Sequence, residues 1–221
     1  MTMTESLRTP LYDRHLELGA KIVDFAGWAM PLHYRGGIIA EHLATRKQAG
    51  LFDVSHMGRF ALRGGQALRF LQHVLTNNAA ALEVGQAQYT IVPNDAGGAI
   101  DDAYLYRFFQ EEFLLVVNAA NRRTVWEHFQ GFLAGFGDVV LQDRTEELAM
   151  IAVQGPQSRE IVSSLIVDGR LPEPKRNALS VVRMGGDDAL VARTGYTGAV
   201  SYTHLRAHET PEHLVCRLLL E

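Results

Sequence analysis

Three consecutive apolar runs near the middle of the chain constrain the fold more than any other feature. They occupy residues 87–95, 98–108 and 112–120, and each is rich in β-branched and aromatic residues. Turn-forming glycine, asparagine and aspartate residues separate the first run from the second. Short runs of this kind joined by turn residues predict an antiparallel meander. Whatever surrounds it must therefore be compatible with an antiparallel sheet.

Helical patterns occur on both sides of the predicted meander. Thr9 and Pro10 suit the start of a first helix, and Gly19 suits its end. Further helices are predicted at residues 37–50, 65–75, 121–137 and 157–167. Further strands are predicted at residues 21–28, 56–64 and 147–156, and residues 178–184 and 188–198 are predicted to pair as a hairpin. Helices and antiparallel strands are mixed without a regular βαβ order, so the expected fold class is α+β.

Composition excludes several classes of function. The net charge of −4 over 221 residues gives no basic stripe for nucleic acid, and no apolar run reaches membrane-spanning length. The only cysteine, Cys216, excludes an intrachain disulfide and a cysteine-based zinc site. The N-terminal residues lack the pattern of a signal or transit peptide, so we expect a cytoplasmic protein.

Two adjacent acids, Asp101 and Asp102, stand near the start of the second apolar run. Neighbouring side chains on a strand point to opposite faces, so the two carboxylates cannot serve the same purpose. From spacing alone, an acid close to a glycine pair is more often a turn residue that binds backbone donors than a functional group.

Six segments in register resemble one family. They are "TPLYDRHLELGAKIVDFAGWAMPLHY", "GLFDVSHMGRFALRG", "GGAIDDAYLYRF", "LVVNAANRR", "AVQGPQS" and "ARTGYTG". Together they resemble the T-protein of the glycine cleavage system, the tetrahydrofolate-dependent aminomethyltransferase. The resemblance covers residues 7–198. It implies that an aminomethyl group passes from a lipoyl arm on the partner H-protein to tetrahydrofolate, the co-substrate, with release of ammonia. No metal is implied.

The resemblance also implies roles for particular residues. The first acid of the "IDD" motif, Asp101, would be the catalytic carboxylate and face the folate, with Asp102 on the opposite face as its structural neighbour. The implied folate-binding residues are Met57, Tyr89, Val117 through its backbone, Asn118 and Tyr196. Each has an ordinary structural explanation as well: Met57 suits core packing, and Tyr89 suits a half-buried strand position.

The family's architecture implies two interleaved α+β domains. We expect residues 1–50 and 138–199 to form the first and residues 51–137 to form the second. The C-terminal β domain of the family is expected to be missing. The chain also departs from the family pattern at Ala199, before the position of a folate-binding glutamate.

Residues 200–221 are expected to be foreign to the natural protein. "VSYTHLRAHET" back-translates to a transposon end and adapter used in sequencing libraries, and "LVCRLLLE" fits the continuation of that adapter. His204 and His208 stand at metal-ligand spacing within this segment, but a foreign origin removes that interpretation. On this hypothesis the chain is an N-terminal fragment, and we expect the fragment to be inactive.

Three alternative functions remain open, and the first two belong to the same superfamily or share its fold. One is a folate-dependent demethylase, or the folate domain of a sarcosine or dimethylglycine dehydrogenase. Another is a non-catalytic folate-binding scaffold. The scaffold proteins carry a cysteine motif after the position of "AVQGP", and this chain has no cysteine there. A purely structural protein is the third.

Overall fold

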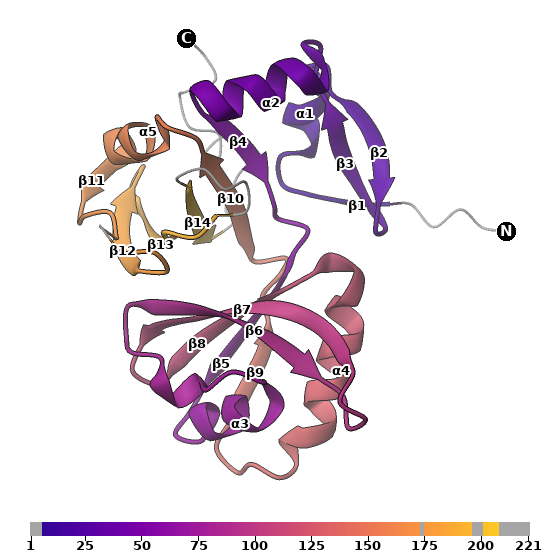
Figure 1. The fold of residues 1–221 in the computed structure, drawn as a ribbon, viewed down its shortest axis with the longest axis vertical. Helices are drawn as coiled ribbons and strands as arrows, with labels where there is room; N and C mark the ends of the chain where they lie inside the picture. The colour runs from indigo at the N-terminus through magenta and orange to yellow at the C-terminus, as the bar shows by residue number, and fades with distance from the viewer. Residues whose placement is uncertain (1–5, 173–174, 196–200, 208–221) are drawn as a thin grey trace, which may run out of the picture.

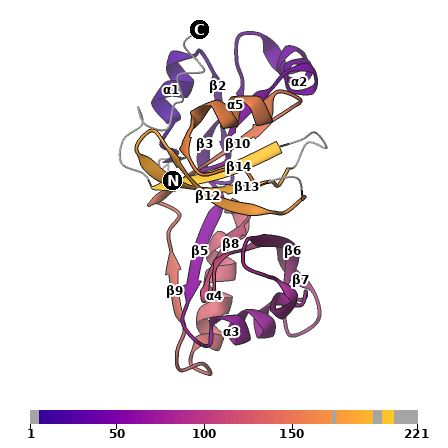
Figure 2. The same ribbon diagram turned by 90° about the vertical axis from the view of Figure 1, so that its left-hand side faces the viewer.

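The structure, a computed structural model, describes residues 6–172, 175–195 and 201–207, with the backbone alone for 201 and 204–207. Helices and largely antiparallel sheets are mixed, and the expected α+β class is confirmed. Figures 1 and 2 show two parts of the molecule, with α1, α2 and α5 in one and α3 and α4 in the other. None of the helices in the described ranges is long and apolar enough to cross a membrane.

The lower part in Figure 1 is built on a five-stranded sheet of order β6-β7-β8-β5-β9. Its strands are β5 (Gly58–Arg63), β6 (Gln86–Pro93), β7 (Ala99–Phe109), β8 (Glu112–Val117) and β9 (Val140–Asp143). The strands β6, β7 and β8 follow one another in sequence and pair antiparallel. The predicted meander is therefore confirmed.

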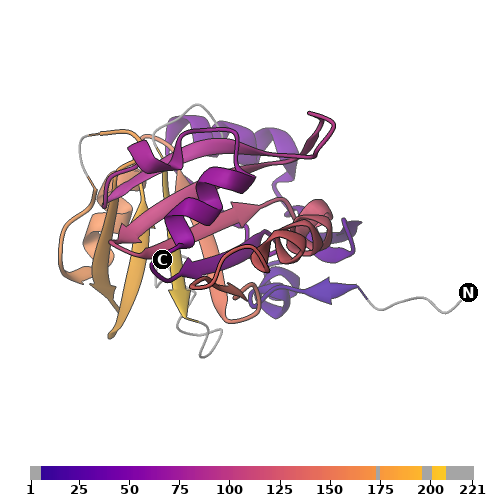
Figure 3. The same cartoon turned by 90° about the horizontal axis from the view of Figure 1, so that it is seen from below.

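Two helices cover one face of this sheet. They are α3 (Ala67–Val74) and α4 (Arg122–Leu133), and Figure 3 shows both against the sheet from below. Short 3₁₀ turns precede β6 and α4, at Ala79–Ala81 (η1) and Ala119–Asn121 (η2). Phe70 of α3 and Phe129 of α4 are fully buried and meet edge to face at 5.5 Å between ring centroids. Their burial gives the sheet a closed hydrophobic core on this side.

The second part contains a six-stranded sheet of order β11-β12-β13-β14-β10-β4. Its strands are β4 (Gly50–Asp53), β10 (Leu148–Gln154), β11 (Ile166–Asp168), β12 (Leu179–Met184), β13 (Asp187–Ala192) and β14 (Ser201–Ala207). Every residue of β10 is buried. Its residues alternate between a core shared with α5 (Ser158–Leu165) and a core shared with the five-stranded sheet. The two large sheets therefore pack on each other through one face of each.

A small three-stranded sheet of order β1-β3-β2 completes the fold. It comprises β1 (Leu7–Arg8), β2 (Lys21–Phe25) and β3 (Trp28–His33), beside α1 (Tyr12–Glu17) and α2 (Gly37–Lys47). The sequence predicted one strand at 21–28, but β2 and β3 form a hairpin. Ala26 and Gly27 both have positive φ, of 53° and 81°, as a two-residue hairpin turn requires.

Sheet membership differs from the expected domain boundaries at two strands, and the division into two interleaved domains stays a prediction. β4 was expected in the second domain, yet it pairs with β10 in the six-stranded sheet. β9 was expected in the first, yet it pairs with β5 in the five-stranded sheet. The chain therefore crosses between the sheets at residues 54–57 and 144–147.

The strand β14 lies between β10 and β13. The foreign origin predicted for residues 200–221 concerns the gene that encodes them and stays a prediction.

Candidate functional site

The strand β7 presents its two acids to different surroundings. Asp101 shares a face with Ala103 and Leu105, which belong to the core beneath the helices. Asp102 shares the opposite face with Tyr104 and with Tyr106, which packs against the six-stranded sheet. Asp101 is only 5% exposed, whereas Asp102 is exposed. Asp101 therefore points into the packed interior, where it was expected to face folate, and Asp102 points to an accessible surface; which acid meets folate stays a prediction.

The Asp101 carboxylate is fully engaged within the protein. One oxygen accepts the backbone N–H of Asn118 at 2.8 Å. The other accepts the side-chain amides of Asn118 and Asn121, each at 2.8 Å. Three donors from one short segment satisfy a buried carboxylate, as burial of a charge requires. This arrangement suits a structural role, and it leaves Asp101 remote from any ligand on the opposite face.

Asp102 lies at the uncovered end of its sheet face. The six-stranded sheet covers this face around Tyr106 and Phe108 but does not bury Asp102. We define the open end as Tyr89, Ile91, Asp102 and Tyr104. Register pairs Tyr89 with Tyr104 and Ile91 with Asp102 across β6 and β7, so all four side chains share one face.

The open end combines flat aromatic surface with one carboxylate. Tyr89 is 48% exposed and lies edge to face with Tyr104 at 5.9 Å between ring centroids. Desolvation and the neighbouring Asp102 carboxylate raise the pKa of Tyr89. Asp102 in turn accepts the Asn118 side-chain amide at 2.8 Å. Such a surface can stack a planar heterocycle and accept a hydrogen bond from it.

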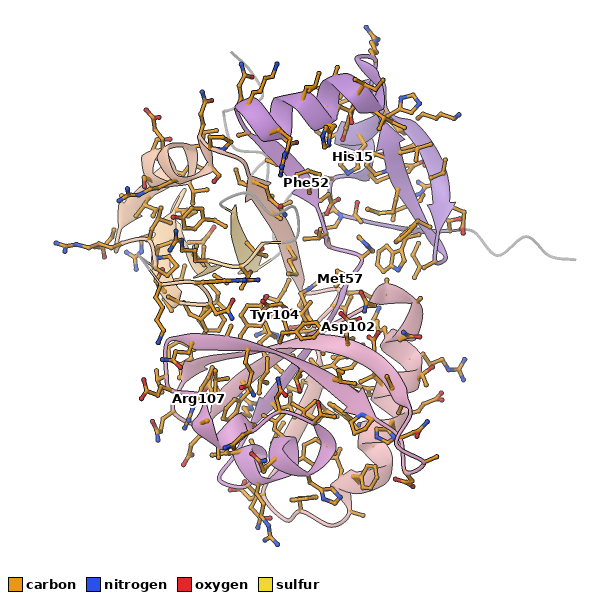
Figure 4. The ribbon with its side chains drawn as sticks, in the orientation of Figure 1. His15, Phe52, Met57, Asp102, Tyr104 and Arg107 are labelled. Carbon is orange, nitrogen blue, oxygen red and sulfur yellow. The ribbon has the colours of Figure 1, made fainter. Side chains whose placement is uncertain are left out.

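Met57 stands at the crossing between the sheets, at the edge of this region. It is partly buried and packs against the core between the two large sheets. Figure 4 shows Met57, Asp102 and Tyr104 where the five-stranded sheet meets the rest of the molecule. The buried Arg59 guanidinium donates to the carbonyl oxygens of Met57 at 2.5 Å and of Ser55 at 2.8 Å, and to that of Thr145.

The environment of Arg59 is unusual for a cation. Burial, with a smaller contribution from Arg122, lowers the pKa of Arg59 to about 10. Its three carbonyl acceptors come from both crossing segments. Arg59 therefore ties the two crossings together and fixes the backbone that carries Met57.

The remaining predicted residues have different positions. Val117 is fully buried beneath the helices, so only its backbone could reach a ligand. Asn118 is partly buried, and its amide bonds both acids. Tyr196 lies outside the described residues. The structure thus brings Tyr89, Asn118 and Met57 to the region of Asp102, while Asp101 serves the interior.

Sequence reasoning missed Asp102, Tyr104 and Ile91 as candidate site residues. The strand alternation of "IDDAYLY" places Asp102, Tyr104 and Tyr106 on one face and was available as a signal. Alternation alone does not say which face is covered. Within the described ranges, no group of three or more histidine, cysteine, aspartate or glutamate side chains could hold a metal ion.

Two hollows lie elsewhere on the described surface. One of about 680 Å³ is lined by residues of α3 and by Phe136, and another of about 350 Å³ is lined by residues of β1 and by Trp28 and Thr145. Neither is lined by Tyr89 or Asp102. The open end of the sheet face, which we take as the candidate site, is therefore separate from both hollows.

Comparison with known proteins matches the sequence of this chain to one family. The family model described as the GCVT N-terminal domain matches residues 11–219. An aminomethyltransferase of Thermus thermophilus is 46% identical over 212 residues, which are 96% of this chain and 60% of that protein. An aminomethyltransferase of Deinococcus deserti is 48% identical over 191 residues, 86% of this chain and 53% of that protein. The chain thus spans about 60% or less of these relatives.

Solved structures agree with the fold. The glycine cleavage system aminomethyltransferase T of Bartonella henselae matches with a TM-score of 0.80 and 35% identity, over 90% of this chain and 53% of that one. The heterotetrameric sarcosine oxidase of Corynebacterium sp. U-96 matches with a TM-score of 0.56 and 17% identity, over 79% of this chain and 85% of that one. The second likeness shows the fold alone.

Proposed function

The chain belongs to the GCVT N-terminal domain family, and from this membership we propose that it is part of a glycine cleavage aminomethyltransferase. Its relatives named aminomethyltransferase and its likeness to the Bartonella henselae enzyme support this. The proposed substrates are tetrahydrofolate and an aminomethyl group carried by the lipoyl arm of the H-protein.

The reaction needs two bonds to form at one methylene carbon. N5 of tetrahydrofolate attacks that carbon as the carbon–nitrogen bond to ammonia breaks. N10 then attacks as the carbon–sulfur bond breaks. The N5 and N10 protons end on ammonia and on the lipoyl thiol, so the products are ammonium, 5,10-methylenetetrahydrofolate and reduced lipoyl. A carboxylate beside N5 can accept its proton as the new bond forms.

We assign that carboxylate role to Asp102. The single observation that carries the assignment is its exposure between Tyr89 and Tyr104 on the open end, held by the Asn118 amide. The resemblance alone had given the role to Asp101, but that carboxylate is buried with three internal donors. Tyr89 and Tyr104 would hold the flat pterin, and Met57 would contribute apolar contact at its edge.

The direct test is a titration of the ¹⁵N-labelled chain with 5-formyltetrahydrofolate, a stable folate, followed by two-dimensional NMR. Chemical shifts report binding even when it is in the millimolar range. We expect shifts concentrated on β6 and β7 around residues 89–91 and 102–104, and saturation only at higher probe concentration in the Asp102→Asn variant. Shifts confined to either hollow, or no shifts at millimolar probe, would overturn the assignment.

A further inference from the structure

The proposed function uses Asp102 but gives Asp101 no task, although Asp101 is the more heavily bonded acid. We propose that Asp101 is a positioning residue that acts through the Asn118 side-chain amide to fix the carboxylate of Asp102. This inference rests on the proposed function only for the identity of the ligand that Asp102 meets. The arrangement of the two acids and the amide stands on its own contacts.

The first step is the location of Asn118. The strand β8 ends at Val117, and the last β7–β8 pair on this side joins Val117 to Ala103. Asn118 continues in extended conformation, with φ −67° and ψ 141°, and leads into η2. Asp101 lies beyond the last pair of the ladder, so its carboxylate takes the Asn118 N–H that no strand residue accepts. The carboxylate therefore determines where the Asn118 backbone sits.

The second step is the orientation of the Asn118 side chain. A primary amide carries two N–H groups on one nitrogen. The Asn118 Nδ2 atom lies 2.8 Å from an oxygen of Asp101 and 2.8 Å from an oxygen of Asp102. It also lies 3.3 Å from the Asp102 carbonyl oxygen. One amide thus links two carboxylates whose side chains leave the strand on opposite faces.

The third step is what holds Asp101 itself. Asn121, at the end of η2, donates its side-chain amide to the same Asp101 oxygen at 2.8 Å. Asp101 is therefore hydrogen-bonded by the segment that precedes α4. The helix α4 packs into the core through Val125 and Phe129. A continuous set of hydrogen bonds, through Asn118 and Asn121, thus connects the exposed Asp102 carboxylate to the segment that leads into α4.

The consequence concerns pre-organisation. A free aspartate on a strand surface samples several side-chain rotamers, and fixing one of them costs entropy when a ligand binds. The Asn118 amide restricts Asp102 before any ligand arrives. Groups held by a supporting layer of hydrogen bonds keep the geometry that chemistry needs. Asp101 and Asn121 supply that layer here.

The first experiment needs no ligand. Three-bond NMR couplings of the Asp102 Cα–Cβ torsion are measured in the 221-residue chain and in its Asp101→Asn and Asn118→Ala variants. We expect a single rotamer in the unaltered chain and rotamer averaging in both variants. Asp138→Asn is the matched control, because the Asp138 carboxylate also accepts a backbone N–H, that of Gly65 at 2.8 Å, without contacting Asn118. Retention of one Asp102 rotamer in both test variants would overturn the inference.

The second experiment is a double-mutant cycle with 5-formyltetrahydrofolate as the probe. Asp101→Asn should weaken binding roughly 5- to 10-fold when Asp102 is present and leave it nearly unchanged when Asp102 is already Asn, because residues in one hydrogen-bond network are not additive. Equal losses in both backgrounds would contradict action through Asp102. Failure of the unaltered chain to bind would count against the proposed function, and the rotamer measurement would still decide this inference.

Discussion

Two carboxylate-centred clusters in this molecule use the same chemistry in different settings. Around Asp53, the His15 Nε2 atom lies 3.1 Å from one oxygen and the Ser55 N–H lies 2.9 Å from the other. The Tyr34 hydroxyl bonds the other ring nitrogen of His15 at 2.8 Å. Asp53 and His15 are 8% and 4% exposed. In the Asp102 cluster the carboxylate is exposed; it accepts the Asn118 side-chain amide and raises the pKa of the neighbouring Tyr89 phenol.

The two clusters differ in exposure, and we propose that this difference separates a structural carboxylate from one that meets a ligand. The Asp53 cluster joins α1, the segment before α2 and the end of β4, and every member faces another part of the chain. Figure 4 shows His15 within the upper part, away from Asp102. Burial would raise the pKa of Asp53, but hydrogen bonds from His15 and Ser55 outweigh it and lower the pKa. We therefore expect the closed cluster to govern stability and the open one to govern binding.

The largest expected effect is on the closed cluster. Asp53→Ala leaves His15 and the Ser55 N–H without their buried acceptor, so it should lower the free energy of unfolding by about 3–4 kcal/mol. Because the folded-state pKa of Asp53 is lowered, its contribution is present above the ordinary value near 3.8 and is lost as pH falls through the folded value. Urea denaturation at pH 7 and in acid checks both points. A decrease in the free energy of unfolding below about 1 kcal/mol at pH 7 would show that the Asp53 cluster contributes little to stability.

A smaller effect is expected at Tyr34. Burial, then the charges of Asp53 and Glu41, raise the pKa of Tyr34 to about 12 from its usual 10. Tyr34→Phe should cost about 1 kcal/mol near pH 7, the worth of one hydrogen bond. Tyr34 contributes stability that is complete below pH 10 and is lost as pH rises through 12, so the gap between the two proteins should shrink over that window. A difference in stability between the two proteins that widens with pH would show that the pKa of Tyr34 is not raised.

The smallest expected effect comes from the matching change in the open cluster. Tyr89→Phe removes the same hydroxyl from an exposed phenol, so the thermal midpoint should stay unchanged within error while the affinity for 5-formyltetrahydrofolate falls. Calorimetry and the NMR titration give the two readings on one sample. Comparable thermal losses for Tyr89→Phe and Tyr34→Phe would remove the distinction between the clusters.

Much of the fold could be predicted because its signals are local. The meander at β6–β8 follows from alternation, and the β12–β13 hairpin follows from the turn at Gly185 and Gly186, which both have positive φ. The β2–β3 hairpin was missed because Ala26, which has no turn preference, occupies a position of positive φ. The sheet membership of β4 and β9 was not predicted, because both pair with strands distant in sequence and nothing local records such pairing.

The candidate site was predictable in its residue types and not in its orientation. Alternation correctly separates Asp101 from Asp102, but it cannot say which face the helices will cover. That depends on α3 and α4 packing against one face while the six-stranded sheet takes part of the other. Which acid is exposed could therefore be read only when both layers were in place.

One measurement tests the division between the adjacent acids most directly: urea denaturation of Asp101→Asn and Asp102→Asn side by side. Asp101→Asn replaces a buried acceptor of three donors and should lose about 2 kcal/mol. Asp102→Asn changes an exposed carboxylate and should stay within about 0.5 kcal/mol of the unaltered chain. Equal losses, or a larger loss for Asp102→Asn, would contradict the assignment of Asp101 to the fold and Asp102 to the ligand.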